Sequence, residues 1–274
     1  VTGRIDVRTG QPYPAYKESG VEWLGKVPEH WEVVALRHLA TKFGSGITPR
    51  GGVAVYVPTG IPFLRSQNVH FDGLRLSGVA RIPIDLHLGL NGSHVRPGDV
   101  LLNITGASIG RVCTVPDDLG DANVNQHVCI IRPRPERVLP SFLAAFLSTS
   151  GMQNAIELAQ VGASRQGLTL DSIRSLKLFV PPVSEQEIIV EAVHRAWDRF
   201  TVLASAATRQ IALLREYRTR LIADVVTGKL DVREVAVELP ETDTLAADRD
   251  RAAAVPTEPN PHSTERDMVK EAIP

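Results

Sequence analysis

A long helical pattern dominates the C-terminal half of the chain. From Val190 to Val225, apolar residues recur at alternating spacings of three and four, over five heptads, and Arg218 is the only polar residue among them. Such spacing is typical of the seam of a coiled coil. No Gly or Pro interrupts the pattern before Gly228, so it predicts one long helix. The seam positions are Val190, Val193, Trp197, Phe200, Ala204, Ala207, Ile211, Leu214, Arg218, Leu221 and Val225.

The predicted helix covers residues 184–225. Pro181-Pro182 ends a preceding strand, and Ser184 with Glu187 forms the signature of a capping box. At 1.5 Å per residue the helix would be about 60 Å long. No other predicted helix in the chain equals it, so we expect a long partner helix, and we expect Arg218 to set register or orientation. The expected coiled-coil interface consists of Val193, Trp197, Phe200, Ile211, Leu214, Arg218 and Leu221.

Shorter patterns fill the region before this helix. Short apolar runs bounded by turn residues predict strands at 60–64, 99–105, 110–115, 126–132 and 176–180. Helical spacing predicts helices at 34–42, 140–147, 151–158 and 170–174. Mixed short elements without a regular strand-helix-strand alternation predict an α+β domain, which a long helix follows.

An eight-residue sequence occurs twice. Residues 1–8 read Val-Thr-Gly-Arg-Ile-Asp-Val-Arg, and residues 226–233 read Val-Thr-Gly-Lys-Leu-Asp-Val-Arg. The second copy follows the long helix, and the first stands where a preceding helix would end. The repeat predicts a parent with two units, each a globular domain followed by a helix. The missing helix would supply the partner for the seam.

Charge is unevenly divided along the chain. Residues 234–274 hold ten acidic and four basic residues, which leaves a net charge of +5 for residues 1–233. The densest basic excess lies between Arg37 and Arg111. A basic body favours a phosphate-rich partner, although chance clustering on a solvated surface gives the same counts. The tail is expected to be disordered, with a functional acidic tail as the alternative.

The composition also bounds location and chemistry. No apolar run reaches the roughly 18 to 20 residues that span a bilayer, and the first residues lack a signal-peptide core. Two cysteines fit a reducing cytoplasm, and Cys113 and Cys129 are expected to be buried. We find no methyltransferase loop, phosphate-binding loop or nuclease carboxylate pair, and the histidines lack ligand spacing. Neither catalysis nor a metal or cofactor is therefore predicted.

Several segments together resemble a known family. Residues 16–31, the strand pattern at 98–102, 106–110 and 123–127, and the entry to the long helix at 181–187 are similar to type I restriction-modification specificity subunits. The end of the helix at 226–233 is similar as well. Each motif is short, but their combination over residues 16–233 is specific. The resemblance divides the chain into the end of a preceding conserved region (1–15), a target recognition domain (16–183), a conserved helix (184–225), and the helix end with the tail (226–274).

The resemblance implies a non-catalytic subunit that reads a split DNA site. Each recognition domain of such a subunit reads one half, and two conserved helices pack as an antiparallel coiled coil that sets the spacing. Partner subunits would methylate adenine, translocate DNA and cleave it. With one recognition domain, the chain is expected to be either a fragment or a natural half-subunit that dimerises, and the second half would come from the parent chain or a homodimer.

Four loops carry side chains suited to double-stranded DNA. Arg reads guanine, Asn and Gln read adenine, and Gly and Ser let the backbone approach phosphate. Arg65 and Arg165 are the best single candidates, whereas Asn123, Asn125 and Gln126 favour a structural role. The candidates are Ser45, Thr48 and Arg50; Arg65, Gln67 and Asn68; Ser108 and Arg111; and Ser164, Arg165 and Gln166.

A second hypothesis remains open from the residues alone. The protein could be a coiled-coil assembly scaffold whose globular domain binds another protein. The repeat and the basic domain favour the DNA-reading hypothesis, because a scaffold requires neither.

Overall fold

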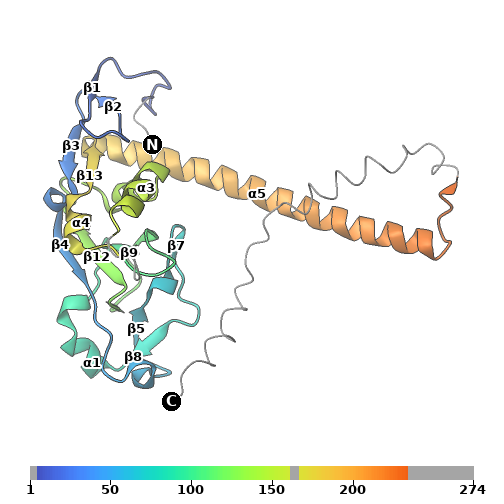
Figure 1. Ribbon diagram of the computed structural model, residues 1–274, viewed down its shortest axis with the longest axis horizontal. Helices are drawn as coiled ribbons and strands as arrows, with labels where there is room; N and C mark the ends of the chain where they lie inside the picture. Colours follow the sequence, from blue (N-terminus) through green and yellow to red (C-terminus); the bar gives the residue numbers. More distant parts are fainter. Residues whose placement is uncertain (1–4, 161–166, 234–274) are drawn as a thin grey trace. The chain divides into compact units, whose positions relative to one another are not determined.

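The computed structural model describes residues 5–160 and 167–233 of the chain (Figure 1). The chain divides into two compact units, Val1–Thr201 and Val202–Pro274. The predicted acidic tail and the loop that contains Arg165 lie outside the described residues. Among those residues, no helix is both long enough and apolar enough to cross a membrane.

A four-stranded antiparallel sheet forms the centre of the first unit. Its order is β10 (Val112–Thr114), β9 (Val100–Asn103), β12 (Val128–Pro133) and β4 (Ala40–Ser45). The first three correspond to predicted strands, whereas β4 was not predicted. Leu101 lies opposite both Cys113 and Ile130, which fixes the register of β10, β9 and β12.

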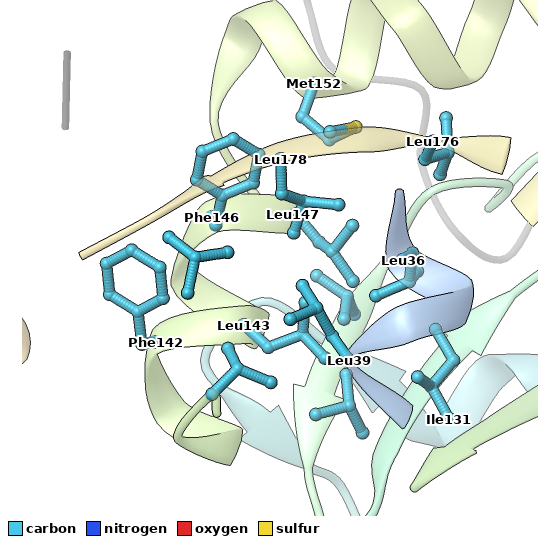
Figure 2. Packing of buried hydrophobic residues seen from close by; sticks show 14 of the residues in the cluster. Leu36, Leu39, Ile131, Phe142, Leu143, Phe146, Leu147, Met152, Leu176 and Leu178 are labelled. Atoms are coloured by element: carbon cyan, nitrogen blue, oxygen red, sulfur yellow. The ribbon is translucent and has the colours of Figure 1, made fainter. Parts of the chain in front are cut away.

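Helices cover one face of this sheet. The predicted helices form as α2 (Pro140–Leu147), α3 (Ser150–Leu158) and α4 (Leu170–Ser175). Figure 2 shows side chains of α2 clustered with Leu36, Leu39 and Ile131. The apolar side of α2 is buried against the sheet, and this burial contributes to the stability of the domain.

A three-stranded sheet lies against the other face. Its order is β11 (Asn123–Val124), β5 (Ile61–Leu64) and β8 (Ala80–Ile82), and β11 runs parallel to β5. Successive side chains of a strand point to opposite faces. Leu102 therefore joins the helix-side core, whereas Leu101 joins Leu64 in the core between the sheets. Burial on both faces explains why β9 and β12 are almost continuously apolar.

Shorter elements complete the first unit. Strand β13 (Lys177–Val180) corresponds to the predicted strand at 176–180 and pairs with β3 (Glu32–Ala35). The remaining elements are β1 (Tyr16–Glu18), β2 (Lys26–Pro28), β3 (Glu32–Ala35), β6 (Val69–His70), β7 (Gly73–Leu74), β13 (Lys177–Val180), the helix α1 (Ile84–Gly89), and the 3₁₀ turns η1 (Leu36–His38), η2 (Gly52–Val55), η3 (Ser66–Asn68) and η4 (Asn91–Ser93).

The predicted helix at 34–42 is wrong. Leu36, Leu39 and Ala40 are buried at helical spacing, but Leu36 begins the 3₁₀ turn η1, Leu39 follows that turn, and Ala40 is the first residue of β4. Strand β3 pairs with β13, where Val34 lies opposite Leu178. Pairing between such distant segments leaves no trace in the local spacing, and this tertiary contact overrides the helical pattern.

The helix α5 (Val183–Val226) is 44 residues long and begins at a buried polar junction. The carbonyl of Pro182 accepts from the amide of Gln186, so the helix starts ahead of the expected cap at Ser184. Glu185 accepts hydrogen bonds from the hydroxyl of Tyr13 and, at 3.2 Å, from the indole of Trp31. Its other oxygen lies 2.9 Å from Nε2 of His30. These contacts hold the first turn of α5 on the domain.

Most of the predicted seam is exposed. Trp197, Phe200 and Leu214 are 52%, 61% and 66% exposed. Val190 differs, because it is 8% exposed and packs in the core of the domain. Its assignment to the seam is therefore corrected: the open stripe begins at Val193.

Candidate nucleic-acid interface

Three of the four predicted loops meet at residues 123–127. The amide of Gly46, in the first loop, donates to the carbonyl of Asn125 at 3.1 Å. The amide of Asn125 donates to the carbonyl of Leu64, next to the second loop, at 3.0 Å. The amide of Ile104, before the third loop, donates to the carbonyl of His127 at 2.9 Å. Segments far apart in the sequence thus form one surface.

A chain of polar side chains crosses this surface. The hydroxyl of Thr48 donates to Oε1 of Gln126, and Nε2 of Gln126 lies 3.1 Å from Nε2 of His127. The Nδ1 atom of His127 shares a hydrogen bond with the hydroxyl of Thr105. Thr48 and Gln126 are exposed. Their donors and acceptors are of the kind that recognises base edges.

Gln126 and His127 were not among the predicted contacts. The expectation of a structural role is right for Asn123 and Asn125, which are 0% and 6% exposed. Gln126 is exposed instead, because it follows β11 where the chain turns toward β12. The sequence signal for Gln126 and His127 was a run of polar residues between two apolar strands. Such a run does not reveal which side chain faces outward.

Asn123 belongs to a buried polar cluster beneath the surface. Its Oδ1 lies 2.6 Å from Nδ1 of His87, and its Nδ2 donates to the hydroxyl of Ser93 at 2.8 Å. The rings of His87 and His94 stack with their centroids 4.1 Å apart. These contacts join β11 to α1 and η4 and so support the segment that carries Gln126.

The second loop contains one residue that faces inward. Asn68 is 2% exposed, accepts from the amide of Arg65 at 2.9 Å and donates to the carbonyl of Arg75 at 2.8 Å. Asn68 is therefore engaged in its own turn, and its contact with bases stays a prediction. Gln67, its neighbour, is exposed.

Arg65 remains a candidate at the edge of the surface. It is half-buried, and its guanidinium lies 5.6 Å from the centroid of the Tyr56 ring. Stacking on an aromatic ring orients a guanidinium and leaves its outer nitrogens able to bind guanine or phosphate. Its Nε is buried and has no hydrogen-bond partner among the described residues.

Asn103 ties the second and third loops together. Its Nδ2 donates to the carbonyl of Ser66 at 2.8 Å and to the hydroxyl of Ser108 at 3.0 Å. Ser108 is thus half-buried and already bonded, so it fits a positioning role better than base reading. Arg111 is half-buried, and its carbonyl accepts from the amide of Asn103 at 2.9 Å.

The remaining predicted residues fall at the ends of the surface. Ser45 is half-buried at the end of β4 opposite Cys129, and Arg50 is exposed. The predictions for Ser164, Arg165 and Gln166 lie outside the described residues. Gly167, which follows them, forms a bridge with Thr105. The described end of the fourth loop is therefore also at this surface.

The charge of the surface favours an anionic partner. Residues 44–50, 65–68, 103–111 and 123–127 contain Arg50, Arg65, Arg111 and His127 but no Asp or Glu. Such a distribution attracts phosphate. Cys113 and Cys129 are buried nearby, and burial raises the pKa of each thiol to about 12. The described residues contain no cluster of His, Cys, Asp or Glu that could hold a metal ion.

Comparison with known proteins places this surface in context. Residues 28–209 match the model of the type I restriction modification DNA specificity domain. The chain is 24% identical over 207 residues to the type I restriction enzyme EcoBI specificity subunit of Escherichia coli, an alignment that covers 74% of this chain and 43% of that protein.

Two solved structures are similar in fold. One comes from work on complex assembly and conformational transition of the type I R-M system, and it has a TM-score of 0.58 at 18% sequence identity. The matched region covers 76% of this chain and 48% of that protein chain. The HsdS subunit from Thermoanaerobacter tengcongensis has a TM-score of 0.50 at 19% sequence identity. The matched region covers 70% of this chain and 42% of that subunit. The chain thus spans under half the length of each of these relatives.

Proposed function

Because the chain belongs to the family of type I restriction modification DNA specificity domains, we propose that it reads one half of a bipartite DNA site. The observation that carries the proposal is the convergence of the loops on Gln126 and His127 at a surface without acidic residues. Arginines there would hold the phosphates, and Gln126 would read a base edge.

The chain acts in this proposal without catalysis and without a cofactor. It directs adenine methylation and restriction, which methyltransferase subunits and a restriction and translocase subunit perform. The methyltransferase would flip the target adenine out of the duplex. A second recognition half, from a longer parent chain or a homodimer, would read the other half-site. The comparisons give no support to the scaffold hypothesis.

The exposed stripe of α5 supports the need for a second half. Trp197, Phe200 and Leu214 are more than half exposed, which is costly for a helix that has no partner. Leu203 and Tyr217 lie outside the seam and are also exposed, at 69% and 64%. They provide further apolar surface for the methyltransferase subunits.

The test is adenine methylation mapping in cells that express the chain with its methyltransferase partner. We expect a new split motif, palindromic if two copies of the chain pair. Arg65→Gln should remove the motif or relax one position in it, because a guanidinium at the surface is lost. Arg134→Gln is the matched control. Arg134 is exposed and directly follows β12, at the end of that strand away from residues 123–127. A stable complex that methylates no motif would refute the proposal.

A further inference from the structure

Two cations lie directly opposite each other on the central sheet. Lys42 on β4 is the register partner of Arg132 on β12. Residues that are opposite on antiparallel strands project from the same face, with Cβ atoms about 5 Å apart, and like charges in such a pair repel each other. The fold therefore holds an unfavourable pair of charges that a bound anion would relieve.

The carboxylate beside this pair is already engaged. Nε and Nη2 of Arg132 donate to the two oxygens of Asp99 at 2.7 and 2.8 Å. The amide of Arg96 donates to Oδ2 of Asp99 at 2.8 Å. The side chain of Asp99 is 1% exposed, so these bonds hold it in the interior. Within the described residues, Lys42 forms no ion pair of its own.

Lys42 has cations as close neighbours. It is half-buried, and burial is the chief cause that lowers the pKa of its ammonium group. The charge of Arg132 lowers this pKa further, the charge of Asp99 opposes that effect, and the charge of Arg96 again lowers it. Arg96 is exposed. Three cations thus gather around one carboxylate that is bonded to Arg132.

The three cations lie close to the surface that the loops form around residues 123–127. Lys42 precedes Ser45, the last residue of β4, by three residues. That separation is about 10 Å along a strand. It equals about three base-pair steps of 3.4 Å along a DNA helix. A duplex that is bound by the loops is therefore long enough to reach Lys42 as well.

We propose that Lys42, with Arg132 and Arg96 beside it, is a second binding site for DNA phosphate, outside the half-site that the loops read. A bound phosphate would neutralise the opposed charges and give Lys42 an anionic partner that no described residue provides. Phosphate contacts position a protein on DNA without reading sequence. The inference rests on the proposed function, because the same duplex occupies the loops, and it extends the footprint on DNA beyond them.

The position of Lys42 also suits a simpler role, which the test must separate from phosphate binding. Strand β4 is at the edge of the four-stranded sheet. Lysines on edge strands hinder pairing with the strands of other chains. In that role, loss of Lys42 would change the association of the protein with itself and would leave DNA binding unaltered.

Salt dependence of DNA binding tests the proposal. Lys42→Gln should reduce the slope of log affinity against log salt by about 0.9, because one phosphate contact is lost. Between about 50 and 200 mM salt, the affinity advantage of the unchanged protein over the variant should therefore fall about 3.5-fold. The change in slope should be the same for a duplex with the mapped motif and for an unrelated duplex of equal length. Fluorescence anisotropy on the 274-residue chain, bound to its methyltransferase partner, measures both.

Two further variants serve as controls. Lys42→Arg keeps the charge and should keep the slope. Lys17→Gln removes an exposed lysine of β1 and should keep it as well. An unchanged slope for Lys42→Gln would overturn the proposal, and so would an effect on the motif duplex alone. Self-association of Lys42→Gln with an unchanged slope would assign Lys42 to protection of the sheet edge.

Stability provides a readout that a structural role would move in the other direction. Lys42→Gln removes a like charge opposite Arg132, so its denaturant midpoint should stay the same or rise while its DNA affinity falls. A lower midpoint together with an equal loss of DNA affinity in Lys42→Arg would assign Lys42 to folding and overturn the proposal.

Amine labelling locates the contact on the unchanged protein. Acetylation of lysines, followed by mass spectrometry, should show that duplex DNA protects Lys42 severalfold more than it protects Lys17. Equal protection of the two lysines would contradict a phosphate contact at Lys42.

The two proposals fail separately. If the motif and unrelated duplexes bind equally well but Lys42→Gln lowers the slope for both, the DNA-reading function fails and the phosphate site stands. If binding specific to the motif persists and Lys42→Gln leaves the slope unchanged, the phosphate site fails alone.

Discussion

At the scale of the residue, single atoms determine which loops can meet. Gly46 approaches residues 124–125 so closely that a Cβ atom built on it would lie 1.7 Å from the carbonyl oxygen of Val124. That oxygen belongs to the backbone and cannot rotate away. Gly44 lies two residues earlier, inside β4, and has only Lys42 Cε at 3.7 Å from such a Cβ. The close approach explains why the first loop reaches the surface through a glycine.

Gly46→Ala should therefore lower the free energy of unfolding by about 3 kcal/mol, because the strand and loop must separate to admit the methyl group. Gly44→Ala should change the free energy of unfolding by less than about 0.5 kcal/mol. Urea unfolding followed by tryptophan fluorescence measures both. Equal stabilities of the two variants would show that the approach at Gly46 is not tight.

At the scale of the element, the first turn of α5 is held by polar side chains and not by a capping box. Gln186 is 0% exposed. It accepts from the amide of Leu139 at 2.8 Å and donates to the carbonyls of Arg137 and Pro181 at 2.9 and 2.8 Å. One side chain thus fixes α5 to the start of α2 and the end of β13. Buried main-chain groups need such partners.

Gln186→Leu should lower the free energy of unfolding by about 3 kcal/mol, because it leaves buried main-chain groups without hydrogen bonds. The same substitution at Gln210, which is exposed and lies off the seam, should change the free energy of unfolding by less than about 0.5 kcal/mol. Denaturant midpoints at constant slope provide the comparison. A stable Gln186→Leu protein would mean that the junction depends on apolar contacts alone.

At the scale of the whole molecule, affinity and sequence reading should separate. The surface combines arginines suited to phosphate with Gln126, whose amide suits a base edge. Phosphate contacts release counterions and make binding depend on salt, whereas base contacts set specificity. The two contributions come from different residues of one surface and can be measured apart.

Arg50→Gln should weaken binding to all sequences and reduce the slope of log affinity against log salt by about 0.9, because one phosphate contact is lost. Gln126→Ala should leave the slope unchanged and weaken binding to the cognate half-site alone by about 1 to 3 kcal/mol. Fluorescence anisotropy at several salt concentrations measures both effects. A changed slope for Gln126→Ala would assign that residue to phosphate binding.

The sequence by itself determined the features that arise from local order. Helix α5 occupies 183–226, next to the predicted 184–225, because its signal is periodic and uninterrupted. The inner strands of the central sheet were predicted because they are buried on both faces and therefore apolar throughout. The repeat and the family resemblance are also properties of the sequence alone, and the family match confirms the latter.

Only the tertiary structure decided what distant segments do to one another. Pairing with β13 makes a strand of residues whose spacing favoured a helix. Contacts within the loops turn Asn68 inward, while Gln126 faces outward, although both are polar residues in turns. The base contacts of the predicted site residues stay predictions. The physical reason is common to these cases: long-range contacts outweigh local preferences of about 1 kcal/mol or less per residue.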